Sequence, residues 1–232
     1  MTRAVLRKDL VALWTSPIPY VVGALFNLVL TTLYVNELEV RQQALIQPLF
    51  PLAGFLLLAL VPVVTMRSFA EEAKTGTLDL LLAVPVRPGP LVAGKWLAAW
   101  LTVVVAAAPS AVFALLLHRW GEPDGGPILA GFLGLTLLVG AVSGLGVLAS
   151  TFTSSQPVAA MVTLFTGLLL WFAHVGADSL SSGTVFLHLS VSERLRSFAG
   201  GVVDLSDVAF FAVLAAAALL VSAAVLDGRR LR

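Results

Sequence analysis

The sequence contains no cysteine and few charged residues. Of its 232 residues only 12% are charged, 59% are hydrophobic, and the mean hydropathy is +0.98. The absence of cysteine excludes a disulfide framework, a thiol nucleophile and a cysteine-ligated zinc site. Soluble domains carry about 25% charged residues, so this composition excludes a soluble enzyme and a disordered protein. The formal net charge of +1 is too small for nucleic-acid binding. The composition therefore predicts an integral membrane protein.

Long apolar runs occupy most of the chain. A helix needs about 20 mostly apolar residues to cross a bilayer, and these runs do not alternate as the strands of a membrane barrel would. We therefore predict an all-α polytopic membrane protein with six transmembrane helices, forming a single domain over residues 1–232. The predicted spans are Ile18–Val35, Leu49–Met66, Trp96–Leu117, Ile128–Ser150, Val158–Val175 and Val208–Leu226.

Basic residues gather on one side of the predicted membrane domain. With six spans both termini share a side, and that side holds ten of the fourteen Lys and Arg residues. Because Lys and Arg are enriched in cytoplasmic loops, we expect both termini and the loop at 67–95 to be cytoplasmic. Residues 1–16 place Arg3, Arg7 and Lys8 opposite an apolar stripe. This pattern predicts an amphipathic helix at the membrane interface, with a plain basic anchor as the alternative.

The spans have no charged side chain in their central parts, and no hydrolase motif is present. A proton-coupled carrier usually needs a titratable relay inside the membrane, so energy for uphill transport would enter from outside the bilayer. The segment Gly89–Lys95 fits GxxxxGK, but Trp96 stands where a phosphate-binding loop needs Ser or Thr. Three scattered histidines are interpreted as interfacial residues. We predict no catalytic, cofactor-binding or metal-binding residue in this chain.

The most informative stretch is MRSFAEEAKTGTLDLLLAVP at Met66–Pro85. Gly76 is a natural helix C-cap, and Thr77 can begin a second short helix. Leu78 and Leu82 then share one face of that helix. A leucine stripe held outside the membrane favours docking on a partner protein; an interfacial helix lying on lipid is the alternative.

This stretch, with the LVAGK that follows it, resembles the membrane subunits of ABC-2 type transporters. It is closest to the permeases of gliding motility and nitrous-oxide maturation. A second block, HLSVSERLRSFAGGVVDLSDVAFF at His188–Phe211, is similar to the stretch that precedes the last helix in that family. The two blocks bracket the six predicted spans, so the resemblance covers essentially the whole chain.

The resemblance implies a type V exporter-like fold and a permease subunit of an ATP-binding cassette transporter that exports or extrudes a substrate. A separate cytosolic ATPase subunit would bind ATP and Mg, and no cofactor would belong to this chain. A second permease copy would complete a homodimer, or a related permease a heterodimer, in contact with membrane lipid. An additional membrane or periplasmic subunit is compatible with this arrangement. The expected location is the plasma (inner) membrane of a prokaryote.

A membrane scaffold or assembly factor, recruiting a cytosolic partner without transport, is the alternative function. The resemblance also implies two sets of functional residues by position, one in the cytoplasmic loop and one in an outer reentrant segment at 176–207. The expected ATPase-coupling contact consists of Glu71, Glu72, Gly76, Thr77, Leu78 and Leu82, and the outer set consists of Leu195, Phe198, Gly201, Asp204 and Asp207.

Overall fold

The apolar runs form α-helices, since a helix satisfies its backbone hydrogen bonds within one segment. The computed structural model describes residues 2–43, 45–78, 88–120, 124–176 and 188–230, and every regular element in this part is helical. The elements are α1 Thr2–Thr15, α2 Ile18–Arg41, α3 Leu49–Thr65, α4 Arg67–Thr75, α6 Pro88–Ala107, η1 Ala108–Ala111, α7 Val112–Trp120, α8 Gly125–Phe152, α9 Gln156–Trp171, η2 Ala173–Gly176, α11 Val191–Ala199 and α12 Leu205–Arg230.

In the part of the chain that the structure describes, five helical stretches are long and apolar enough to cross a membrane. Helix α9 is also apolar but has only 16 residues. At 1.5 Å per residue it reaches about 24 Å, less than the roughly 30 Å of a hydrocarbon core. The prediction of six spans is therefore not confirmed by length. The five stretches are Ile18–Arg41, Leu49–Thr75, Pro88–Leu117, Gly125–Phe152 and Leu205–Arg229.

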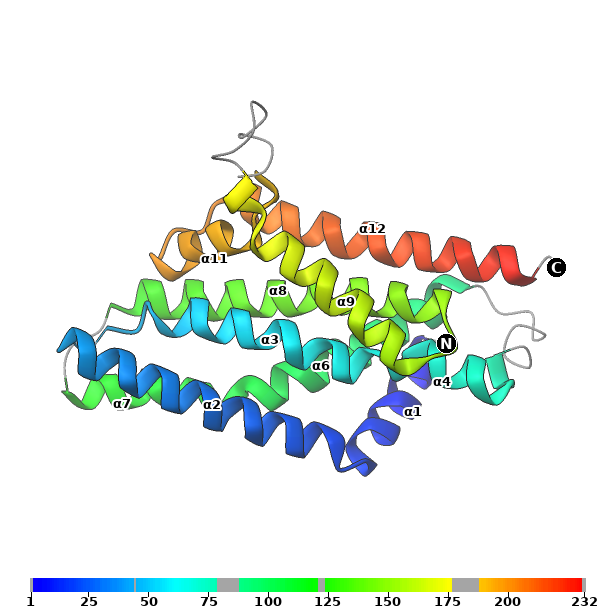
Figure 1. Cartoon of the computed structure of the whole chain (residues 1–232), viewed down its shortest axis with the longest axis horizontal. Helices are drawn as coiled ribbons and strands as arrows, with labels where there is room; N and C mark the ends of the chain where they lie inside the picture. Colours follow the sequence, from blue (N-terminus) through cyan, green and yellow to red (C-terminus); the bar gives the residue numbers. More distant parts are fainter. Residues whose placement is uncertain (1, 44, 79–87, 121–123, 177–187, 231–232) are drawn as a thin grey trace.

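Helix α8 lies at the centre of the bundle, between α3 and α12 (Figure 1). Its glycines permit this position. A Cβ added at Gly146 would fall 2.1 Å from Thr65 Oγ1 of α3, and one at Gly144 would fall 3.3 Å from the Cα of Ala215 in α12. Small residues at such contacts let helix backbones approach closely in a membrane. These two glycines of α8 thus serve helix packing within the chain.

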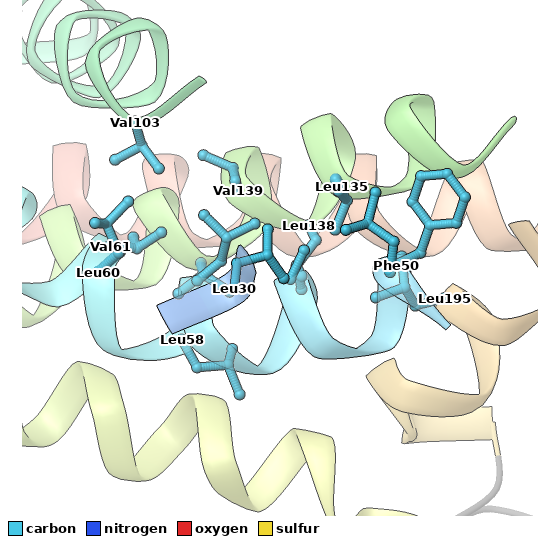
Figure 2. Packing of buried hydrophobic residues seen from close by; sticks show 14 of the residues in the cluster. Leu30, Phe50, Leu58, Leu60, Val61, Val103, Leu135, Leu138, Val139 and Leu195 are labelled. Carbon is cyan, nitrogen blue, oxygen red and sulfur yellow. The ribbon is translucent and has the colours of Figure 1, made fainter. Parts of the chain in front are cut away.

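Helix α3 is surrounded by apolar side chains from its neighbours. Figure 2 shows Val61 of α3 in the same cluster as Val103 of α6 and Val139 of α8, all at most 2% exposed. Leu58 points to the other side of α3, where its Cδ2 lies 3.3 Å from the Cβ position of Gly167 in α9. The core therefore forms around α3 and α8.

Two stacked tryptophans join α6 to α8. The rings of Trp96 and Trp100 are 5.5 Å apart and nearly parallel, at 3°. Trp96 Nε1 donates to the carbonyl of Gly140 at 2.8 Å, and Trp100 Nε1 donates to the carbonyl of Thr136 at 3.0 Å. Because donors and acceptors are both four residues apart, these bonds set the register of the two helices.

Both termini lie at one end of the bundle, where α1 and α4 also lie, whereas α7 and α11 lie toward the other end (Figure 1). Pro109 interrupts the third predicted span, which passes through the 3₁₀ turn η1 between α6 and α7. This end carries the basic residues of α1, which are Arg3, Arg7 and Lys8, and those of α4, which are Arg67 and Lys74. It is also the end at which the candidate functional site forms.

Candidate functional site

Helix α4 follows the C-terminal end of α3, with only Met66 between the two helices. It ends at Gly76, whose φ of +71° is left-handed, a conformation that glycine adopts without the steric cost of a Cβ. The predicted C-cap at Gly76 is confirmed. Phe69 and Ala70 are buried, Glu72 is partly buried, and Glu71 is exposed. Helix α4 therefore presents an anchored face to the bundle and a free face to solvent.

Lys95 is the central charge of this end, and only 5% of it is exposed. Helix α6 carries it toward α4, where Lys95 Nζ donates to Glu72 Oε1 at 2.8 Å. The same ammonium lies 3.4 Å from Asp9 Oδ2 of α1 and 5.1 Å from the centre of the Phe69 ring. One buried cation thus connects three helices that are far apart in sequence.

Lys8 adds an outer pair to this cluster. Its Nζ lies 3.5 Å from Glu72 Oε1, but its side chain is 64% exposed. Exposed pairs contribute little because solvent screens them. We call Lys8, Asp9, Glu72 and Lys95 the charged junction, in which the buried Lys95–Glu72 contact is the firm connection.

Breaking the charged junction costs free energy, and this cost opposes relative movement of the helices that it joins. Removing one partner of a buried ion pair leaves an uncompensated charge, at a cost of about 3–5 kcal/mol. A displacement of α4 that separated Glu72 from Lys95 would meet that cost. Helix α4 and the start of α6 are therefore expected to move together.

Leu78 occupies a different position from the one that the leucine stripe suggested. It is 3% exposed and packs with Phe69 of α4, Leu91 of α6 and Val147 of α8. The expectation that Leu78 is free to anchor a partner protein is therefore corrected. Its side chain instead packs the segment against the chain's own helices. Leu82 lies outside the described residues.

The hydroxyl of Thr77 lies 2.9 Å from the hydroxyl of Thr75 and 3.4 Å from the carbonyl of Glu72, so it bonds back to α4. The second short helix that Thr77 is predicted to cap continues into residues 79–87, which lie outside the described residues. The exposed residues of α4 and of the two positions after it are Glu71, Lys74, Thr75, Gly76 and Thr77. Of the predicted coupling set, three residues are exposed and two are held by the bundle.

The segment that fits GxxxxGK is helical. Gly89 to Lys95 form the first two turns of α6, which begins at Pro88. The ammonium of Lys95 points toward Glu72 and Asp9 and forms ion pairs with both carboxylates. The segment is therefore a helix and not the loop that cradles phosphate in a phosphate-binding site.

The outer set comes together around α11. Leu195 and Phe198 are fully buried; a Cβ at Gly54 of α3 would fall 2.4 Å from Leu195 Cδ2, and one at Gly134 of α8 would fall 2.8 Å from Phe198 Cβ. Gly201 has a φ of +84° and ends the turn that follows α11. The helix is thus packed onto the bundle through large side chains set against glycines.

Polar contacts hold the connection from α11 to α12. Arg194 donates to Asp207 Oδ1 at 2.5 Å and to the carbonyl of His188 at 2.7 Å, and its guanidinium lies 4.2 Å from the Phe210 ring centre. Asp204 Oδ1 accepts from the backbone N–H of Ser206 at 2.9 Å. All five residues of the outer set therefore have structural contacts or a required backbone conformation in the described chain.

Sequence reasoning missed the Asp9–Lys95 contact. Lys95 was expected to lie at the cytoplasmic interface, and Asp9 was not singled out. One signal was available, since Asp9 is the only acidic residue in a helix that otherwise carries Arg3, Arg7 and Lys8. Within the described residues no group of three or more His, Asp and Glu side chains is arranged to hold a metal ion.

Comparison with known proteins agrees with the architecture. A family model described as "ABC-2 family transporter protein" matches residues 4–189. The match includes α1, α4, α6 and therefore the whole charged junction, and it ends before α11 and α12. A search of curated proteins found no match. With most of its length covered by this model, the chain belongs to the ABC-2 family of transporter membrane proteins.

Proposed function

We propose that this chain is the permease subunit of an ATP-binding cassette transporter, and that a separate cytosolic ATPase powers export of its substrate. Membership of the ABC-2 family and the apolar helices support the membrane role. Membership of this family also implies, in general, a separate ATP-binding subunit. The observation that carries the proposal is the buried Lys95–Glu72 contact, because it joins a solvent-facing helix to a membrane-spanning one.

The ATPase contact is proposed at the end of α4 and in the segment that follows it. Glu71, Gly76 and Thr77 are exposed there and would meet the ATPase directly. Glu72 and Leu78 are turned inward and would pass the displacement to α6 and α8. Leu82 completes the proposed contact set from the sequence alone.

Charge reversal tests this contact. An affinity-tagged chain is purified from its native host in mild detergent, and the ATPase that copurifies is quantified together with its phosphate release. Glu71→Lys should reduce copurification at least tenfold, which corresponds to about 1.4 kcal/mol. Glu39→Lys, an exposed charge reversal at the far end of α2, is the matched control. Normal association of Glu71→Lys would contradict the contact.

ATP turnover separates transport from recruitment. Lys95→Met should leave the ATPase bound but remove the change in phosphate release that membrane reconstitution produces, because the α4–α6 connection is lost. If ATPase binds the wild-type chain and its turnover never responds to reconstitution, the chain recruits a partner without coupling.

The proposed orientation places both termini in the cytoplasm of a prokaryotic cell, with the chain in the inner membrane. The cysteine-free sequence permits a clean test by single-cysteine labelling. Thr75→Cys should react only from the cytoplasm and Gln43→Cys only from outside, since both positions are exposed and lie at opposite ends of the bundle. Labelling from the reverse sides would overturn the orientation.

The working unit is proposed to be a pair of permease chains, of the gliding-motility and nitrous-oxide-maturation kind that the sequence resembles. Two-fold pairing gives a pathway between protomers that a single small bundle does not enclose. Native mass spectrometry of the ATPase complex should show two copies of this chain. A transport-active complex with one copy would contradict the pair.

A further inference from the structure

A partly open cavity of about 260 Å³ lies beside the charged junction and is lined by residues of α1, the start of α2, the end of α3, α4 and α6. Its level in the bundle is given by the residues that line it. Ile18 begins α2, and Val64 is one residue from the end of α3. Because spans begin and end where hydrocarbon gives way to polar headgroups, the cavity lies at headgroup depth.

The lining of this cavity is amphipathic. One wall is apolar and includes Leu13, Val63 and Val64. The rest carries charges of both signs in equal number, so the site as a whole is neutral. The charged lining residues are Lys8, Asp9, Arg67, Glu71, Glu72 and Lys95. A neutral site with separated charges suits a ligand that is zwitterionic rather than purely anionic or cationic.

Buried polar atoms without a hydrogen-bond partner gather in this cavity. Within the described residues there are five such side-chain N or O atoms, and three of them belong to cavity-lining residues: Asp9 Oδ2, Arg67 Nε and Glu72 Oε2. Asp9 Oδ2 lies 3.4 Å from the Lys95 ammonium, so Arg67 Nε and Glu72 Oε2 are the two that have neither a hydrogen bond nor an ion pair. Buried polar atoms are normally paired. Asp9 Oδ2 and Glu72 Oε2 can only accept hydrogen bonds, and Arg67 Nε can only donate one. A fitting ligand must therefore supply donors beside the carboxylates and an acceptor beside the guanidinium.

We propose that this cavity binds the headgroup of a phospholipid that carries a primary ammonium group, as phosphatidylethanolamine does. The ammonium donates to the carboxylates of Asp9 and Glu72, and the phosphate accepts from Arg67. The acyl chains leave along the apolar wall of Leu13 and Val63. Bound there, the lipid holds α1 to α4 and brings the charged junction under the influence of bilayer composition. This inference does not depend on the proposed transport function.

The chemistry of the site distinguishes among headgroups. A choline headgroup has the same charges, but its methylated nitrogen has no N–H to donate. A glycerol headgroup carries phosphate without a cation, and it would bring no ammonium to the free carboxylate oxygen of Glu72. Free phosphoethanolamine has the right polar groups but no acyl chain for the apolar wall. These three compounds therefore serve as discriminating probes.

The first experiment uses the wild-type chain in nanodiscs with equal parts of phosphatidylethanolamine, phosphatidylcholine and phosphatidylglycerol. After release from the nanodisc, native mass spectrometry measures which lipid stays bound. Phosphatidylethanolamine should be retained about tenfold over phosphatidylcholine, since charge-assisted N–H bonds are the difference. Equal retention of these two lipids would overturn the proposal and indicate a water-filled cavity. Displacement by millimolar phosphoethanolamine as readily as by the lipid would overturn the lipid as its source.

Variants then locate the site. Arg67→Gln should lower phosphatidylethanolamine retention to the level of phosphatidylcholine, and Arg67→Lys should restore part of it. Lys74→Gln removes the same charge from the same helix but does not line the cavity, so its retention should match wild type. A monodisperse elution profile confirms that each variant is folded. Retention by folded Arg67→Gln that equals wild type would place the lipid elsewhere.

Discussion

Two short helices, α4 and α11, lie toward opposite ends of the bundle, and different forces hold them. Helix α11 is held by apolar packing, with Leu195 and Phe198 fully buried against glycines of α3 and α8. Helix α4 buries Phe69 but is also tied to two distant helices through Glu72 and Lys95. The charges of α11 are instead paired near in sequence, within 13 residues.

This difference indicates which end can transmit a force. Apolar packing has no direction and resists any displacement, so α11 is suited to closing its end of the bundle. A buried ion pair connects two specific points, so a push on α4 reaches α6 at Lys95. The comparison predicts that disrupting α11 lowers stability alone, whereas disrupting the charged junction lowers stability and coupling together.

The largest effect is expected at Lys95. Lys95→Met leaves the carboxylates of Asp9 and Glu72 buried without their shared cation, and unfolding free energy should fall by about 3–5 kcal/mol. Equilibrium unfolding in mixed micelles measures this loss. A triple variant that adds Asp9→Asn and Glu72→Gln should recover most of the stability without restoring coupling. A loss below about 1 kcal/mol in the single variant would show that α4 is held by packing, as α11 is.

The next effect is expected at Phe198. Phe198→Ala removes a fully buried ring and should cost about 3 kcal/mol, again by unfolding in mixed micelles. Association with the ATPase should be unchanged in the fraction that stays folded. Phe165→Ala, at a position in α9 that is 61% exposed, is the control and should cost far less. Loss of ATPase association in folded Phe198→Ala would remove the contrast between the two ends.

A smaller effect is expected at the Arg194–Asp207 pair. Asp207→Asn weakens a contact whose side chains are 13% and 11% exposed, and stability should fall by about 1–2 kcal/mol. Glu193→Gln breaks the neighbouring pair with Arg196, whose side chains are 63% and 37% exposed, and should have almost no effect. Equal losses in the two variants would argue against a specific role for the buried pair.

The smallest effect is expected at the end of α4. Gly76→Ala places a Cβ in a left-handed conformation, which costs about 1 kcal/mol although no atom lies within 4 Å. Gly89→Ala is the matched control, because it also meets no atom within 4 Å but lies in the helical first turn of α6. Gly76→Ala should lower the midpoint temperature of thermal unfolding, whereas Gly89→Ala should leave it unchanged or raise it. Two equal shifts would mean that the turn at Gly76 is not required.

Local patterns in the sequence predicted the helices and the cap at Gly76, because each depends on residues within a few positions. The partners of Lys95 could not be predicted this way, since Asp9 reaches it only through the fold. Leu78 shows a second limit. A leucine stripe has the same spacing whether it meets a partner protein or the chain's own α8, and only tertiary packing decides. The fifth predicted span, Val158–Val175, differs from α9, which begins at Gln156 and ends at Trp171.

The tryptophan contacts between α6 and α8 have a consequence for conformational change. Two indole N–H groups bonded to carbonyls one turn apart oppose both sliding and rotation, so α6 and α8 behave as one rigid body. A slide by less than one helical turn of about 5.4 Å would move both indoles off their acceptors together. Under the proposed coupling, motion that starts at Lys95 would be carried to the centre of the bundle, and the transport cycle would proceed by hinging or shear of the remaining helices around this pair.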